Sequence, residues 1–136
     1  GFPFNLYVPF DNANTGSGTL GSTERPSLVG QLYPSGFKKT LAQWFNTSAV
    51  SVIPYTYGNL GRNVLRQDSF KNIDLSFSKQ TRITESQHIA LRGEFFNLFN
   101  HPNFGPPDNN FSDAAFGQVL SASNPRFVQF GLKYVF

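Results

Sequence analysis

The sequence contains no cysteine and no methionine, and it carries few charges. Without cysteine, neither a disulfide framework nor a thiolate zinc site is available. Charged residues make up 14% of the chain, whereas they make up about a quarter of a typical soluble domain. The 11 Lys and Arg residues are scattered, with Lys38 and Lys39 the only adjacent pair. The basic stripe of a nucleic-acid-binding protein is therefore missing, and we expect no nucleic-acid partner.

Long apolar runs are absent as well. No segment approaches the length of about 18 apolar residues that a transmembrane helix needs, so no such helix is predicted. The chain starts with Gly1-Phe2-Pro3-Phe4 and shows no signal peptide, so we expect a processed product or a piece of a longer protein. Its 136 residues suffice for one ordinary domain.

Aromatic and neutral polar residues take the place of the missing charges. Aromatics reach 16%, with 16 Phe, and Asn, Ser, Thr, Gln and Gly are frequent. This composition favours a wall that faces water on one side and an apolar medium on the other.

Alternation of apolar and polar residues predicts an all-β, antiparallel fold. We predict strands at about residues 2–10, 70–81, 87–97 and 126–136. Pro3 and Pro9 place the first strand at a sheet edge, because proline cannot donate to a ladder. The other three have one apolar and one mostly polar face. Each is close to the 9–11 residues or so that cross a bilayer at a tilt.

Four charged residues share the polar faces and are predicted to point into an aqueous lumen: Asp74, Arg92, Glu94 and Lys133. Lys71 and Lys79 flank the first apolar stripe, where long side chains can snorkel to the interface.

The connections alternate in length. Long irregular stretches at 11–69 and 98–124 enclose a tight link around residues 83–86. Outer-membrane barrels show the same alternation, with long outer loops and short periplasmic turns. Alternating strands alone favour a soluble β-sandwich, but long irregular stretches are uncommon in compact soluble domains. We therefore interpret residues 1–136 as one section of a transmembrane β-barrel.

The last eight residues, Gln129-Phe130-Gly131-Leu132-Lys133-Tyr134-Val135-Phe136, carry the most specific motif. They resemble the C-terminal β-signal of outer-membrane barrels, which barrel-assembly machinery reads. Its positions here are Gln129, Gly131, Leu132, Tyr134 and Phe136. The alternative is the last strand of a soluble sheet that ends in Phe.

Residues 57–63, 72–76 and 94–105 are similar to C-terminal segments of TonB-dependent receptors that carry a carboxypeptidase-regulatory-like domain. This resemblance implies a barrel of roughly 22 strands with a plugged lumen. It also implies import of a nutrient or polymer fragment across the outer membrane of a Gram-negative bacterium. The implied partners are the rest of the barrel, its plug, the assembly machinery and membrane lipid. TonB would be contacted only by N-terminal parts outside this chain.

No catalytic, metal or cofactor site is predicted. His88, Glu94, His101 and Asp113 match no metal-ligand spacing, and no nucleophile elbow is present. Aromatic residues in the loops are candidates for contact with a sugar or peptide ligand: Trp44, Phe45, Tyr55, Tyr57 and Phe104. The favoured alternative is that these aromatics pack the loops onto one another.

Two other functions remain open at this point. An isolated piece with open strand edges would self-associate into oligomers or filaments. A soluble carbohydrate-binding β-sandwich would use the loop aromatics.

Overall fold

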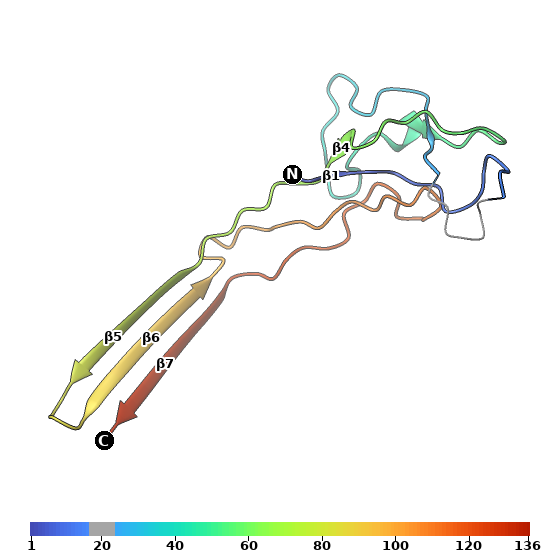
Figure 1. Cartoon of the computed structure of the whole chain (residues 1–136). Coiled ribbons are helices and arrows are strands. Elements are labelled where there is room, and N and C mark those ends of the chain that lie inside the picture. The colour runs from blue at the N-terminus through green and yellow to red at the C-terminus, as the bar shows by residue number, and fades with distance from the viewer. Residues whose placement is uncertain (17–23) are drawn as a thin grey trace. The chain divides into compact units, whose positions relative to one another are not determined.

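The computed structural model describes residues 1–16 and 24–136, and the chain divides into two compact units (Figure 1). We call Gly1–Ser69 with Phe104–Ser121 the loop unit, and Phe70–Asn103 with Ala122–Phe136 the sheet unit. The predicted barrel section, residues 1–136, covers both units.

The sheet unit is built from three antiparallel strands in the order β5-β6-β7, namely β5 (Leu75–Arg82), β6 (His88–Phe96) and β7 (Phe127–Val135). The prediction of an all-β, antiparallel fold is confirmed. Arg82 pairs with His88, which pairs with Val135, so the chain ends beside the β5–β6 turn (Figure 1). The turn is tight because Ile83 N and Thr84 N both donate to the carbonyl of Gln87, at 2.9 and 3.2 Å.

β5 begins later than the predicted strand 70–81. The backbone N–H of Lys71 donates to Asn103 Oδ1 at 2.7 Å, and Asn103 Nδ2 donates to the Lys71 carbonyl at 2.9 Å. A side-chain amide thus takes the place of a neighbouring strand, and Asn103 is buried. The ladder starts only at Leu75, opposite Phe95.

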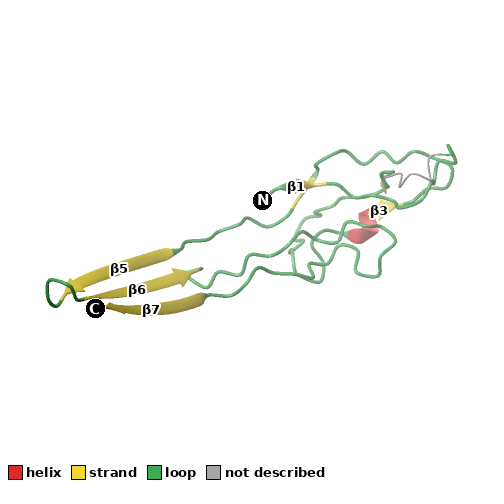
Figure 2. Ribbon diagram, turned by 60° about the horizontal axis from the view of Figure 1, so that its bottom comes forward, coloured by secondary structure: helices red, strands yellow, loops and turns green. Residues whose placement is uncertain are grey.

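Within its described residues, the loop unit contains only very short strands (Figure 2). β1 (Pro3–Phe4) pairs with β4 (Leu65–Arg66), and β2 (Ser27–Leu28) pairs with β3 (Val50–Ser51), after a 3-10 helix at Thr47–Ala49. The predicted long loop 11–69 therefore holds three short strands, and its residues 17–23 lie outside the described part.

The prediction of a strand over residues 2–10 is wrong beyond Phe4. Only isolated bridges follow, at Tyr7 with Asn110 and at Val8 with Glu24. Pairing does not continue past Val8, because Pro9 has no N–H to donate.

A small hydrophobic core holds the loop unit together. Its buried members come from positions spread over the whole unit: Leu6, Trp44, Phe45, Val50, Leu60, Leu65 and Val119. The indole N–H of Trp44 donates to the Arg66 carbonyl at 2.8 Å, so the ring is buried without an unpaired donor. Phe45 meets Phe116 edge-on at 5.4 Å between ring centroids. Irregular loops become a folded unit because these side chains leave water together.

In the described residues, no helix has the length and apolarity required to cross a bilayer.

Candidate functional site

One face of the three-stranded sheet is apolar and exposed. The cross-strand register brings Phe77, Gly93 and Phe130 into one row, and Lys79, Leu91 and Leu132 into the next. Phe130 is 67% exposed and Leu132 is 74% exposed. Lys79 is the only charged side chain on this face within the three strands. A contiguous exposed apolar patch of this kind marks contact with a partner or a membrane.

Gly93 lies at the centre of this face, beneath two aromatic rings. A Cβ built on Gly93 would be 2.5 Å from the ring of Phe77 and 3.2 Å from that of Phe130. Phe95 extends the cluster, with its ring centroid 6.2 Å from Phe77 and 5.8 Å from Phe130. Aromatic side chains that cover a strand glycine compensate for its missing side chain.

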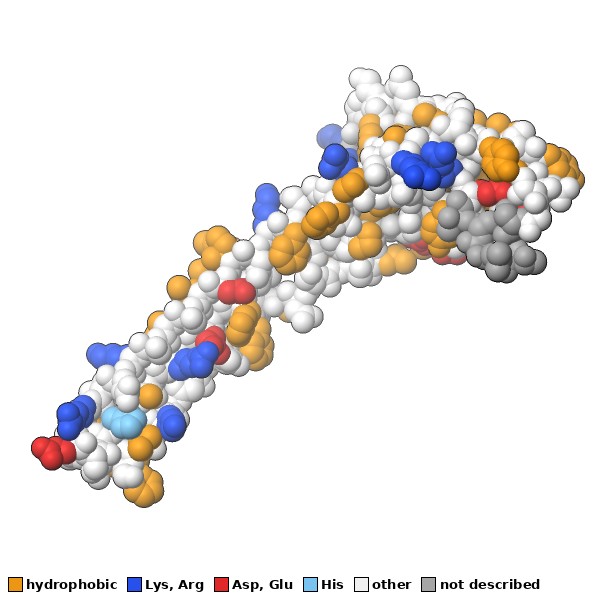
Figure 3. Space-filling view, in the orientation of Figure 1, with side chains coloured by type: hydrophobic (Ala, Val, Ile, Leu, Met, Phe, Trp, Pro, Cys, Tyr) orange, Lys and Arg blue, Asp and Glu red, His pale blue; other side chains and the backbone are white. Residues whose placement is uncertain are grey.

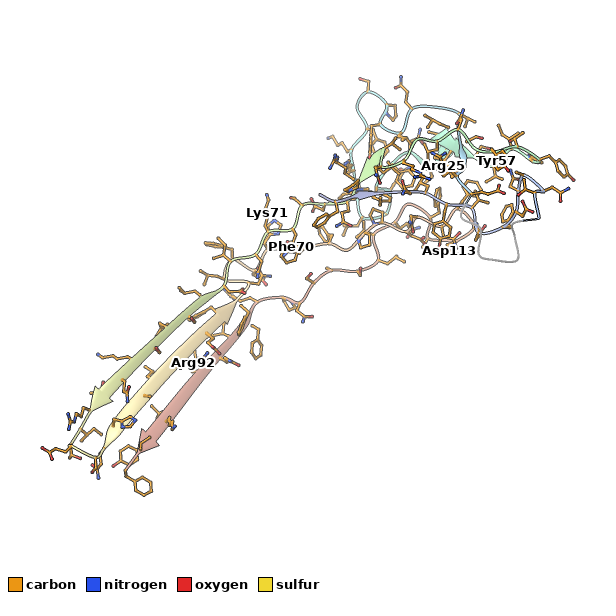
Figure 4. The ribbon with its side chains drawn as sticks, in the orientation of Figure 1. Arg25, Tyr57, Phe70, Lys71, Arg92 and Asp113 are labelled. Atoms are coloured by element: carbon orange, nitrogen blue, oxygen red, sulfur yellow. The ribbon has the colours of Figure 1, made fainter. Side chains whose placement is uncertain are left out.

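The opposite face is polar and carries charges of both signs (Figure 3; Arg92 is labelled in Figure 4). Glu94 forms an ion pair with Arg92, and Gln129 Nε2 donates to the same carboxylate from the next strand. Lys133 shares this face, opposite Ala90. These three predicted polar-face charges therefore share one face.

The fourth predicted polar-face charge, Asp74, lies just before β5 and has a structural role. Its Oδ1 accepts the backbone N–H of Asn97 and the side-chain amide of Asn72, both at 2.9 Å. Asp74 therefore ties the start of β5 to the turn that follows β6.

The residues of the terminal motif divide between the two faces. Gln129 bonds Glu94 on the polar face, while Leu132 and Tyr134 stand on the apolar face. Gly131 is on the polar side, where no described atom lies within 4 Å of a built Cβ. Phe136 follows β7 and is exposed.

Both edges of the sheet are open. Within the described residues, β5 and β7 each pair only with β6. The outward N–H and C=O groups of β5 and β7 therefore have no strand partner among the described residues, and the barrel is not closed within this chain.

Comparison with known proteins identifies the family. The family model described as "Outer membrane beta barrel domain" matches residues 1–129. The chain belongs to this family. No curated protein and no solved structure matches it. The protein is therefore an outer-membrane β-barrel protein, and this chain contributes one part of the barrel.

Membership of this family explains the two faces of the sheet. In outer-membrane barrels an apolar band faces outward and the interior is polar, which is the same division of faces. The family match favours the barrel interpretation over the soluble β-sandwich alternative.

An aromatic pocket lies at the end of the polar face away from the β5–β6 turn. Phe70, Phe96 and Phe127 surround a hollow of about 400 Å³ together with Asn97 and Ser123. The rings of Phe96 and Phe127 are 6.1 Å apart. We did not predict this pocket, although the alternation already placed both rings on the polar face.

The loop aromatics fall into two groups. Trp44 is 7% exposed and Phe45 is fully buried, so the prediction that they contact a ligand is wrong and the packing alternative applies. Phe104 also packs against this core. Tyr55 and Tyr57 stay 80% and 72% exposed. Tyr57 is labelled in Figure 4.

Tyr55 is held in an unusual backbone conformation. Its φ is 61°, which is rare for a bulky residue. Its N–H donates to the Asn12 carbonyl at 3.0 Å, and the Asn12 side chain donates to the carbonyls of Ile53 and Thr56 at 2.7 and 2.9 Å. These hydrogen bonds to Asn12 hold the turn around Tyr55 in this conformation.

No group of three or more His, Asp or Glu side chains capable of holding a metal occurs in the described residues.

Proposed function

We propose that this chain is the C-terminal barrel section of a TonB-dependent receptor, which imports a nutrient or polymer fragment in a Gram-negative bacterium. The observation that carries the proposal is the three-stranded sheet with a lipid-type face, a lumen-type face and two open edges. The family match and the resemblance of residues 57–63, 72–76 and 94–105 to such receptors support it.

In this proposal the assembled receptor, and not this chain alone, carries out import. The remaining strands and the plug complete the barrel, and TonB acts through parts that precede this section. The chain itself is not an enzyme and binds no nucleic acid. Its long connections lie on the outer side, because β7 ends beside the tight turn and short turns face the periplasm in such barrels.

In this proposal the terminal strand is also the signal for barrel assembly. Leu132, Tyr134 and Phe136 offer an apolar ridge that a membrane-embedded assembly factor can recognise. The open edge of β7 gives that factor, and later the first strand of the barrel, a row of backbone groups to pair with.

Isolation of the native protein from outer-membrane fractions tests the import proposal. We expect an intact mass far above 15.2 kDa, a need for detergent, and binding to the periplasmic domain of TonB. A native 136-residue chain that stays dispersed without detergent would contradict it.

Self-association is the second candidate, and the two open edges of the sheet favour it. It predicts large assemblies of the chain in plain buffer, which light scattering measures. Monomers or a single closed barrel in detergent would exclude it.

A further inference from the structure

The loop unit contains a hollow that is lined by cationic and amide side chains. Its volume is about 330 Å³. The lining residues come from three distant segments: Asn5, Leu6, Tyr7, Arg25, Arg62 and Asn63. Figure 4 labels Arg25, and Figure 3, in the same orientation, shows basic side chains at the surface there.

Hydrogen bonds between these segments build the hollow in advance of any ligand. Arg25 Nη1 donates to the Leu60 carbonyl at 2.8 Å, which fixes the guanidinium beside the turn at residues 61–63. The backbone N–H of Asn63 donates to Asn5 Oδ1 at 2.7 Å. Asn63 has a φ of 57°, a conformation that asparagine tolerates well. Leu6 is only 1% exposed and belongs to the core of the unit.

No carboxylate balances the two guanidinium groups in the described part of the unit. No acidic side chain lines the hollow, and neither arginine forms an ion pair with a described residue. The acidic side chains of the unit accept hydrogen bonds from other groups. Asp11 accepts from the backbone N–H groups of Thr15 and Gly16, and Glu24 accepts from the backbone N–H of Ala13. Asp68 and Asp108 accept from the backbone N–H groups of Ser69 and Asn110, and Asp113 accepts from the side-chain amide of Asn110.

Among the described residues, the side-chain groups around the hollow that lack a hydrogen-bond partner are mainly donors. Within that part of the chain, Arg25 uses one N–H on the Leu60 carbonyl, and the Asn5 side chain uses its oxygen to accept the Asn63 N–H. Guanidinium and amide N–H groups arranged around one space match an anionic oxygen ligand, to which arginine makes strong charge-assisted bonds.

We propose that this hollow binds a phosphate or carboxylate group of a small ligand, with Arg25 and Arg62 as its charged contacts. The site requires only the loop unit and does not depend on import. If no anion bound there, the import proposal would be unaffected, and if the import proposal were wrong, the anion site would be unaffected.

Equilibrium dialysis of the full chain in detergent, with radiolabelled inorganic phosphate and separately with succinate, tests the site. We expect saturable binding of at least one anion, and the two arms tell a phosphate ligand from a carboxylate ligand. Arg62→Gln and Arg25→Gln should each weaken binding by about tenfold or more, since each removes charge-assisted bonds. Arg126→Gln is the matched control, because Arg126 is an exposed arginine outside the hollow.

Asn63→Asp is the sharpest variant. It keeps the size of the side chain and its tolerance of a positive φ, but it introduces a carboxylate that occupies the arginines. Phosphate binding should be lost, while Trp44 fluorescence reports an intact core. Absence of saturable binding for both anions would overturn the proposal, as would equal weakening by Arg126→Gln or unchanged binding to Asn63→Asp.

Discussion

Phe45→Ala should unfold the loop unit selectively. Phe45 is fully buried between Phe4 and Phe116, with ring centroids 6.5 and 5.4 Å away. Transfer of a phenylalanine side chain from water contributes about 1.5–3 kcal/mol. Loss of aromatic pairing and the cavity left behind bring the expected destabilisation to about 3–5 kcal/mol.

The assay is urea unfolding of the detergent-solubilised chain, followed by tryptophan fluorescence. Trp44 is the only tryptophan, and it is buried in the same core, so its emission reports this unit alone. Phe45→Leu retains most of the volume and should lose less. Tyr55→Ala is the matched control: Tyr55 is 80% exposed, and its truncation should change the stability by less than about 0.5 kcal/mol.

The reasoning would be refuted if Phe45→Ala and Tyr55→Ala had equal transition midpoints. That result would mean that no common core forms around Phe45. A loss of the far-UV signal of the three-stranded sheet at the same urea concentration would instead show that the two units unfold together.

Other predictions concern the sheet and a loop turn. Leu91→Lys places a charge on the proposed lipid face and should destabilise the barrel in lipid by about 2–4 kcal/mol. Refolding titrations in bilayers measure this loss. Ala90→Lys, on the opposite face, is the control, and an equal loss of stability in both variants would contradict the prediction. Removal of Phe136 should reduce assembly into the outer membrane, scored by heat-modifiable electrophoretic mobility, whereas Phe99→Ser in an exposed turn should not. The pKa of Asp11 lies below its usual value of 3.8, first because the Thr15 N–H donates to the carboxylate. A lowered pKa in the folded state means that this contribution to stability is present above the unfolded pKa and is lost as the pH falls through the folded one. Amide protection of Thr15 and Gly16 should therefore be constant near neutrality and fall only at a pH below 3.8; loss of protection at a higher pH, read by hydrogen exchange, would show the assignment to be wrong.

The sequence by itself determined the architecture of the sheet unit. Side chains on a strand alternate between faces, so the pattern from Leu75 to Arg82 already predicted which residues share the apolar face and which share the polar face. The tight link before His88 and the position of the final strand then determined the antiparallel order. These features follow from local residue order, and for that reason they could be predicted.

Only the tertiary structure decided what the long loops do. Trp44 and Phe45 are buried against residues as distant in sequence as Leu6 and Val119. No periodic pattern of apolar residues in the loops predicts such a core. The same limit applies to Asn103, whose amide replaces a strand at Lys71 from 32 positions away. Arg25 and Arg62 likewise share a hollow only because Leu60 and Asn5 bring their segments together. Contacts between distant segments depend on the fold as a whole, so the local pattern of residues along the chain does not predict them.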